Sequence, residues 1–229
     1  MQDKINILYE DAHIIVVHKP TGLAVQSAGI GQPDLVSELK KYLAEKSEKN
    51  PYLGVVHRLD QPVEGVLVFA KNAKAAGELS RQLQSEAFGK EYLAVACGKP
   101  AKAQAKLVDY LEKANGMAVI TAMEKGKKAV LTYEVQAEML LEEQEISLLC
   151  VTLQTGRFHQ IRIQLSHAGC PLLGDKKYGT QSSLALSEML QVRNVALCAK
   201  TLTFMHPVTK KKLEYTVKPT NSAFDLFVK

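Results

Sequence analysis

The chain of 229 residues is 46% hydrophobic and 23% charged, an ordinary balance for a globular protein that argues against disorder. Its length allows one large domain or two lobes that share a sheet. The formal net charge of +5 suits an anionic partner without establishing one, so the placement of the cations matters more than their number.

Cysteine spacing and the length of the hydrophobic runs exclude several classes of protein. The four cysteines lie far apart among apolar or small residues, a context typical of buried thiols rather than of a zinc site or a disulfide framework. The apolar run at 14–17 is too short for a signal peptide, and no stretch reaches the roughly 18 to 20 apolar residues of a membrane span. We therefore expect a reduced, cytoplasmic protein without a metal or a membrane segment.

Patterns near the N-terminus indicate short strands. They are expected at residues 5–9, 13–18 and 23–26, with a turn at 19–22 between the second and the third. Residues 27–33 hold two glycines and a proline, and are expected to form a loop.

Two helices are expected in the first half of the chain. Asp34 is a good N-cap residue for the first helix, whose apolar stripe is Leu35, Leu39, Tyr42 and Leu43. The second helix is expected at about residues 72–86, with Ala76, Leu79 and Leu83 facing inward.

The rest of the chain is dominated by predicted strands. They lie at residues 65–70, 91–97, 117–123, 129–137, 145–153, 196–204 and 212–217. One further helix is expected at about residues 158–168, ended by Gly169 at the C′ position. This order predicts an α+β fold, a mostly antiparallel mixed β-sheet with flanking helices.

The segment His57-Arg58-Leu59-Asp60 is the first candidate for chemistry. If it is extended, Arg58 and Asp60 project to one side while Leu59 anchors the segment in the core. Pro62 and Gly65 then force a turn, which leaves Asp60 accessible at the end of a strand. The alternative is a surface ion pair between Arg58 and Asp60 that has no function.

A second cationic segment lies at residues 155–162, Thr-Gly-Arg-Phe-His-Gln-Ile-Arg. On the expected helix, His159 and Arg162 share a face with Ser166, and Ile161, Leu165 and Ala168 form the opposing apolar stripe. An arginine placed this way can keep a carboxylate ionised, because a nearby positive charge lowers the pKa of an acid. The spacing alone does not show that Arg162 meets Asp60.

Several motifs, taken in order, resemble the RluA-type RNA pseudouridine synthases. They are residues 19–22 (Lys-Pro-Thr-Gly), 57–60, Gly65, 90–92 (Lys-Glu-Tyr), 155–162, 171–175 (Pro-Leu-Leu-Gly-Asp), 178–179 (Tyr-Gly) and 206–207 (His-Pro). Because these motifs span nearly the whole chain, their combination is far more specific than any one of them.

The resemblance implies an isomerase that converts uridine in ribosomal or transfer RNA to pseudouridine without a cofactor or a metal. Asp60 would be the catalytic carboxylate, attacking either the ribose C1′ or the uracil C6. Arg162 would pair with Asp60, and Tyr92 would lie against the uracil and help to move the proton from C5. We expect a monomer with a single catalytic domain at residues 1–229, a central cleft and no separate N-terminal RNA-binding domain.

Further residues are implied to bind the RNA. Arg58 would enter the base stack beside the extruded nucleotide, and Lys19, Arg157 and His159 would hold phosphates. On the expected strand, Tyr92 has only Ala94 and Ala96 as neighbours on its face, which leaves room for a flat base. Loops at residues 27–33 and 181–192 are candidates for selecting the target, and plain surface loops are the alternative. Basic turns at 125–128 and 210–212 are expected to be solvated hairpin tips, and contact with nucleic acid is the alternative.

One departure from the family pattern follows Asp60. The family usually has a basic or polar pair and then Thr-Ser-Gly, whereas this chain has Gln61-Pro62-Val63-Glu64-Gly65. Glu64 would raise the pKa of Asp60 if it pointed inward, and we expect it to point outward.

Two other functions compete with the synthase. One is an RNA-binding or ribosome-assembly protein that uses the same cleft without catalysis, although a binder gains nothing from a carboxylate that faces phosphates. The other is a metal-dependent nuclease, which would need further ligands at suitable spacing near Asp60.

Overall fold

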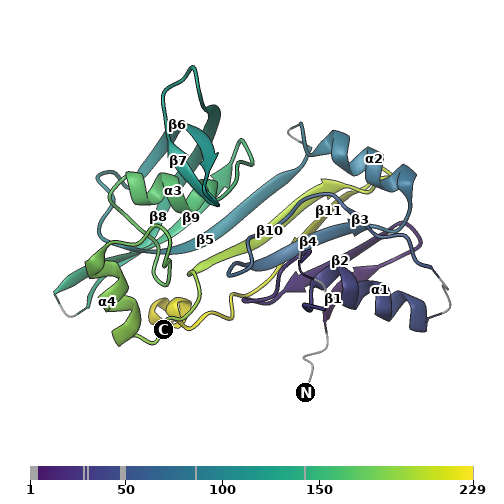
Figure 1. Ribbon diagram of the computed structural model, residues 1–229, viewed down its shortest axis with the longest axis horizontal. Coiled ribbons are helices and arrows are strands. Elements are labelled where there is room, and N and C mark those ends of the chain that lie inside the picture. The colour runs from purple at the N-terminus through teal and green to yellow at the C-terminus, as the bar shows by residue number, and fades with distance from the viewer. Residues whose placement is uncertain are drawn as a thin grey trace. The chain divides into compact units, whose positions relative to one another are not determined.

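The computed structural model describes residues 5–27, 29, 31–46, 50–85, 87–141 and 143–228, and the chain divides into two compact units (Figure 1). One unit comprises Met1–Lys90 and Ala199–Lys218, and the other comprises Glu91–Cys198 and Pro219–Lys229. The strand pairs described below are all antiparallel, and helices flank the strands, so the predicted fold class is confirmed. The single catalytic domain and the central cleft stay predictions.

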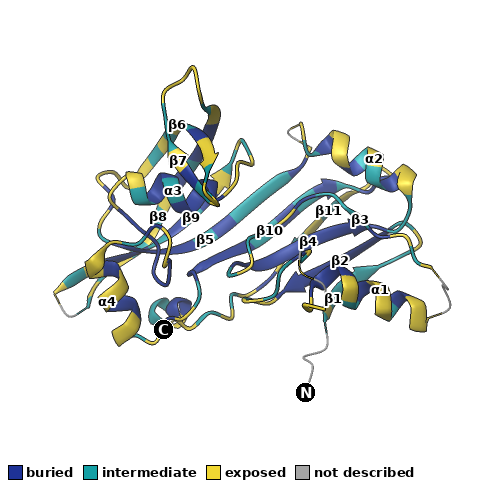
Figure 2. Ribbon diagram, in the orientation of Figure 1, coloured by how far each residue is buried: buried dark blue, intermediate teal, exposed yellow. Residues whose placement is uncertain are grey.

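The first unit is built around two buried strands. Its strands are β1 (Asn6–Glu10), β2 (Ile14–Lys19), β3 (Gly54–Val55), β4 (Glu64–Ala70), β10 (Leu197–Met205, which begins in the second unit) and β11 (Lys212–Thr216). β2 pairs with β1 and β4, β3 with β4, and β11 with β10. Every residue of β2 and β4 is buried, as their continuous apolar runs require (Figure 2).

Two capped helices belong to this unit. Helix α1 (Leu35–Glu45) begins after Asp34, whose carboxylate accepts a hydrogen bond from the backbone N–H of Ser37. Helix α2 (Ala73–Gln82) begins after Asn72, whose side chain accepts one from the N–H of Ala75. Figure 2 shows both helices with an exposed outer side.

The second unit contains antiparallel strands that do not all pair in sequence order. Its strands are β5 (Gly89–Cys97, which begins in the first unit), β6 (Gln104–Ala114), β7 (Met117–Ile120), β8 (Lys127–Leu141) and β9 (Gln144–Leu153), in the spatial order β5-β9-β8-β6-β7. Its helices are α3 (Gln160–His167), α4 (Gln181–Met189) and a 3₁₀ helix (Ser222–Phe227). Helix α3 packs near the β6–β7 hairpin, so the second cationic segment lies beside that hairpin.

Several predicted elements were wrong. Residues 23–26 form only one bridge, between Ala24 and Asp34, and residues 181–189 form helix α4 rather than a loop. Strand β6 was missed because charged residues interrupt its apolar residues, and only Leu111 of the strand is buried. The loop predicted at 27–33 includes positions 28 and 30, which lie outside the described residues.

The inward faces of two helices also differ from the predictions. In α2 the buried residues are Ala75, Leu79 and Gln82, because the Gln82 amide exchanges hydrogen bonds with the backbone of Met205. In α3, Ala168 lies past the end of the helix and is exposed, while Gly169 has the left-handed backbone (φ +82°) expected of a C′ residue. None of the helices in the described ranges is long and apolar enough to cross a membrane.

Candidate active site

The segment that carries Asp60 is extended, and its side chains alternate between core and surface. His57 and Leu59 are buried, Arg58 is exposed, and Asp60 is partly exposed. The predicted alternation is therefore confirmed. It presents one carboxylate and one guanidinium on the accessible side of a segment that is anchored by its other two residues.

His57 anchors this segment as a neutral ring. Its Nε2 accepts a hydrogen bond from the backbone N–H of Val68 at 3.3 Å, and its ring lies edge-on to Phe88 with 5.2 Å between centroids. Burial, with the positive charge of Lys90, lowers the pKa of His57 to about 3. The imidazole is uncharged at neutral pH and serves to hold the segment against β4.

Asp60 begins a tight turn that is clamped by a second turn. Its carbonyl accepts a hydrogen bond from the N–H of Val63 at 3.0 Å, which closes the turn. The Gln61 carbonyl accepts one from the N–H of Gly22 at 2.9 Å, and the Gln61 side chain donates one to the Gly22 carbonyl at 3.0 Å. These reciprocal bonds fix the backbone from which the Asp60 carboxylate projects.

Lys19 lies under both turns, and its predicted role as a phosphate ligand does not fit this position. The side chain is fully buried, and its ammonium donates to the carbonyls of Pro20 (2.8 Å), Leu23 (2.7 Å) and Gln61 (3.1 Å). An ammonium has three N–H donors, so these carbonyls can engage all of them. Burial lowers the pKa of Lys19 to about 8, and the charges of Asp60 and Glu64 oppose that shift. Lys19 therefore positions the Asp60 turn.

Glu64 points inward, so the prediction that it points outward was wrong. It is fully buried at the start of β4, and its Oε2 lies 3.6 Å from Nε2 of His18. Both faces of β4 are covered, so neither direction of the side chain leads to solvent. The neighbouring Gly65 has φ +132°, and a Cβ there would lie 2.4 Å from the carbonyl oxygen of Ala199. Only glycine fits this close approach of two backbones.

Arg58 remains accessible at the surface of the first unit. One of its guanidinium nitrogens donates to the side-chain oxygen of Gln26 at 2.9 Å. An exposed guanidinium held by one neutral acceptor keeps its charge and most of its donors for a ligand. Its position is compatible with the predicted contact to RNA.

In the second unit, Tyr92 lies on β5 with 6% of its surface exposed, opposite Val151 of β9. Ala94 and Ala96 follow at alternate positions of the same strand and are completely buried. The expected alternation of one large and two small side chains is present. Its use as a uracil platform stays a prediction.

Arg162 is buried on α3 and forms a two-pronged ion pair with Asp175. Its Nε lies 2.7 Å from Oδ2, and its Nη2 lies 2.8 Å from Oδ1. Asp175 also accepts hydrogen bonds from the backbone N–H groups of Lys177 and Tyr178. The pair uses two of the five guanidinium N–H groups and fixes the plane of the group.

Asp175, the ion-pair partner of Arg162, was not among the predicted site residues. The family motif at residues 171–175 contains it, but nothing in local spacing links it to Arg162, 13 positions earlier. Arg162 and Asp60 belong to different units, and their pairing stays a prediction.

His159 is also buried, so its predicted role as a phosphate ligand does not fit. It precedes α3 with a left-handed backbone (φ 52°), and its Nδ1 lies 2.7 Å from the hydroxyl of Tyr178. That hydroxyl accepts a hydrogen bond from the N–H of Ala118. The ring of Phe158 stacks on His159 with 3.7 Å between centroids. His159 thus joins α3 to β7 and supports Phe158.

Arg157 lies on the surface, as a phosphate ligand must. Its Nε donates to the carbonyl of Lys128 at 2.9 Å, while its backbone N–H donates to the Gln160 side chain at 2.9 Å. Thr155 donates to the same Gln160 oxygen at 2.8 Å. Gln160 therefore shapes the loop that presents Arg157. Across the described ranges, no three His, Cys, Asp or Glu side chains gather in a group able to hold a metal ion.

Known proteins resemble this chain in sequence and in fold. The family described as RNA pseudouridylate synthase matches residues 13–167. The chain is 37% identical to ribosomal large subunit pseudouridine synthase D of Vibrio parahaemolyticus, over 92% of this chain and 66% of that protein. It is 30% identical to ribosomal large subunit pseudouridine synthase C of Buchnera aphidicola, over 96% of this chain and 68% of that protein. The chain thus spans about two thirds of the length of these relatives.

Solved structures give the same answer for the fold. Human RNA pseudouridylate synthase domain containing 1 aligns with a TM-score of 0.76 at 22% identity, covering 94% of this chain and 83% of the human chain. Human RNA pseudouridylate synthase domain containing 4 aligns with a TM-score of 0.75 at 24% identity, covering 94% and 89%. The family match extends over more than half of the sequence, and the chain belongs to the RNA pseudouridylate synthase family, whose members are isomerases.

Proposed function

We propose that this protein isomerises uridine to pseudouridine in ribosomal RNA, with Asp60 as the catalytic carboxylate. The observation that carries the proposal is the partly exposed Asp60 on a turn that is clamped by Gly22 and supported from below by Lys19. The names of the relatives, which describe synthases of the large ribosomal subunit, favour ribosomal RNA over transfer RNA.

Asp60 would act as an ionised nucleophile. The turn that carries Asp60 is held by hydrogen bonds from Gly22 and Lys19, and it restricts the carboxylate to a narrow range of directions. Attack at the ribose C1′ would detach the uracil, whereas attack at C6 would form an adduct with the base. Both routes break the bond between N1 and C1′, form a carbon–carbon bond between C1′ and the uracil C5, and release Asp60 unchanged. The proton lost from C5 is balanced by a proton gained at N1.

Arg162, Tyr92 and Arg58 would complete the reaction. We assign Arg162 to hold the Asp60 carboxylate in its charged form, with Asp175 fixing the plane of the guanidinium. Tyr92 would stack on the uracil and assist proton transfer from C5. Arg58 would fill the gap in the base stack, which offsets part of the few kcal/mol that extrusion of a nucleotide costs.

The test is a map of pseudouridine in cellular RNA from three strains, which carry the wild-type gene, a deletion, or Asp60→Asn. We expect at least one uridine of ribosomal RNA to be modified only with the wild-type gene. Full modification by Asp60→Asn would refute the catalytic assignment. Unchanged maps in all three strains, together with tight binding of the protein to RNA, would indicate the non-catalytic RNA-binding protein instead. A modified site found only in transfer RNA would support the catalytic assignment and identify transfer RNA, not ribosomal RNA, as the substrate.

A further inference from the structure

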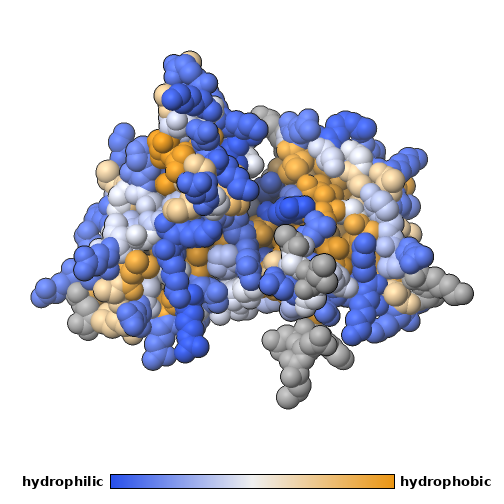
Figure 3. Space-filling view, in the orientation of Figure 1, coloured by the Kyte–Doolittle hydropathy of each residue, from blue (hydrophilic) through white to orange (hydrophobic). Residues whose placement is uncertain are grey.

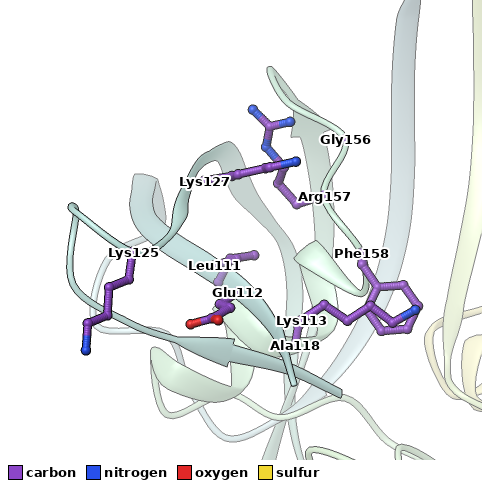
Figure 4. A pocket seen from close by; sticks show the side chains of 9 residues that line it. All are labelled: Leu111, Glu112, Lys113, Ala118, Lys125, Lys127, Gly156, Arg157 and Phe158. Atoms are coloured by element: carbon purple, nitrogen blue, oxygen red, sulfur yellow. The ribbon is translucent and has the colours of Figure 1, made fainter. Parts of the chain in front are cut away.

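A basic groove lies on the β6–β7 hairpin, within the second unit (Figure 4). It has a volume of about 340 Å³ and is lined by the hairpin, the start of β8 and the loop at residues 156–158. Four cations, Lys113, Lys125, Lys127 and Arg157, border the groove against a single carboxylate, Glu112, which gives a local charge of +3. In Figure 3, hydrophilic side chains dominate the tip of this hairpin region. The catalytic assignment of Asp60, Tyr92 and Arg162 uses none of these lysines.

Phe158 provides a flat apolar surface at one end of the groove. It is 40% exposed, unusual for a phenylalanine, and one face of its ring is covered by His159 at an interplanar angle of 22°. His159 is itself held by Tyr178, so the ring of Phe158 rests on a fixed support. An aromatic ring that is rigid and half exposed can stack a base without loss of side-chain entropy.

Several cations line the same groove as this aromatic ring. In Figure 4, Lys127 and Arg157 lie toward one end of the groove, and Lys113 lies across Phe158 at the other. The Nζ of Lys113 is 4.8 Å from the centroid of that ring, so it covers the face that His159 leaves open. This contact of an exposed lysine is weaker than the stacking of a base, so a base can displace the ammonium onto a neighbouring phosphate.

We propose that this groove binds a nucleotide of single-stranded RNA that flanks the target uridine. The base stacks on Phe158, and Lys113, Lys127 and Arg157 hold the adjoining phosphates. This inference rests on the proposed function for the identity of the RNA. The loop that carries Arg157 and Phe158 continues directly into α3, which carries Arg162, so the groove and the assigned guanidinium share one short segment. A ring beside several cations matches a base joined to phosphates better than it matches an acidic peptide, which offers no flat ring.

The experiment measures binding of a short 5′-labelled oligouridylate to the full chain by fluorescence anisotropy at several salt concentrations. Each phosphate contact on a single strand contributes roughly −0.7 to the slope of log K against log salt. The variant Lys113→Gln/Lys127→Gln should therefore reduce the magnitude of the slope by about 1.4. Lys102→Gln/Lys106→Gln is the matched control, because it removes the same charge from exposed lysines of the same unit that do not line the groove.

Phe158 is tested separately from the charges. Phe158→Leu should weaken binding roughly 5- to 100-fold with an unchanged salt slope, whereas Phe158→Tyr should retain the affinity. The melting temperature of each variant shows whether it is folded. If Phe158→Leu were unstable, the variant Lys113→Gln/Lys127→Gln would still test whether the groove holds phosphates.

Two outcomes would refute the proposal that the groove binds RNA. One is that both groove variants bind oligouridylate with the affinity and salt slope of the wild type. The other is that Lys102→Gln/Lys106→Gln reduces the salt slope as much as Lys113→Gln/Lys127→Gln does. Competition by poly-glutamate as strong as that by unlabelled oligouridylate would also contradict it, since it would reduce the site to unspecific charge. These outcomes leave the pseudouridine map untouched. Conversely, unchanged pseudouridine maps together with groove-dependent RNA binding would refute the proposed catalytic function and support the proposed RNA-binding groove.

Discussion

Lys19 shows at the scale of one residue how the fold converts a charge into a structural support. A buried lysine is costly unless its ammonium is hydrogen-bonded, and here three carbonyls from two turns accept hydrogen bonds from it. Those turns are the ones that fix Asp60. The residue therefore supports the position of the carboxylate, even though its charge is shielded from any RNA phosphate.

Replacing Lys19 by methionine should damage both stability and activity. The change keeps the length of the side chain but removes the donor that links the carbonyls of Pro20, Leu23 and Gln61, so we expect a loss of about 2–4 kcal/mol of unfolding free energy. We also expect lower turnover at temperatures where the variant is still folded, because the Asp60 turn loosens. Chemical denaturation and single-turnover assays measure the two effects.

The control for this variant is Lys40→Met. Lys40 is exposed on α1, and its replacement should change stability by no more than about 0.5 kcal/mol. Wild-type stability and turnover in Lys19→Met would show that the buried ammonium does not support the turn.

Arg162 and Asp175 call for a paired experiment, because each is the buried counter-ion of the other. Arg162→Ala alone should cost about 3–5 kcal/mol, since it leaves the Asp175 carboxylate uncompensated. Arg162→Ala/Asp175→Asn removes both charges, and the new amide oxygen can still accept from the backbone of Lys177 and Tyr178. The double variant should thus be more stable than the single one.

Activity should not recover with stability in that double variant. If Arg162 holds the catalytic carboxylate, both variants should lose at least about a hundred-fold in the rate of pseudouridine formation. Melting curves and single-turnover rates on the same preparations separate the effects. A stable double variant with normal turnover would exclude Arg162 from the reaction and leave Asp175 and Arg162 as a structural pair.

At the scale of elements, β4 is the strand that most restricts substitution near the site. It carries the turn that follows Asp60, it is buried throughout, and Gly65 meets the backbone of β10. Gly65→Ala would add a methyl group 2.4 Å from the Ala199 carbonyl oxygen and would strain a backbone with φ +132°. We expect a loss of about 2–5 kcal/mol, from the overlap and the strained backbone together.

Gly77 offers a matched control for this substitution. It lies on α2, and a Cβ there would meet nothing within 4 Å, so Gly77→Ala should stabilise the protein by about 0.5–1 kcal/mol. Urea denaturation of both variants gives the comparison. Equal effects of the two substitutions would show that β4 and β10 can separate at Gly65 without cost.

Helices and strands could be predicted where the local pattern of apolar residues matches their burial. The predictions failed where contacts with residues remote in sequence determine the structure. β2 and β4 have apolar runs that identify them directly, and Asp34 caps its helix as predicted. β6 owes its place to its neighbours β7 and β8, which local sequence does not show.

The site divides in the same way. The alternation of Arg58, Leu59 and Asp60 could be predicted, because it follows from an extended backbone. The burial of Lys19, Glu64 and His159 could not, because residues remote in sequence enclose each of them. Lys19 and His159 were therefore predicted to hold phosphates, although both are buried. The link between Arg162 and Asp175 escaped for the same reason, since it is made by the tertiary fold.

At the scale of the whole molecule, the response to acid should separate into two pH ranges. His57 has a pKa of about 3 when folded and about 6.5 when unfolded. Between these values the unfolded chain holds the extra proton, so stability falls as the pH drops from 6.5. The Glu10 carboxylate is held by Lys71, Lys46 and Tyr42 against the effect of burial, and has a folded pKa of about 2. Its contribution to stability is lost only as the pH falls below about 4.5.

The range between pH 6.5 and 4.5 therefore reports on His57. Over it, wild type should lose roughly 2 kcal/mol through this residue, because each pH unit below the unfolded pKa contributes at most about 1.4 kcal/mol. In the variant His57→Asn, the amide oxygen can still accept a hydrogen bond from the Val68 N–H. This variant should be less stable than wild type at pH 7, and its unfolding free energy should depend less on pH in this range. Urea denaturation at several pH values measures both curves. If the two units unfold in separate transitions, only the transition of the unit that contains His57 should move. Parallel curves for the two proteins would mean that the folded protein can protonate His57, and that this ring is not the anchor of the Asp60 segment.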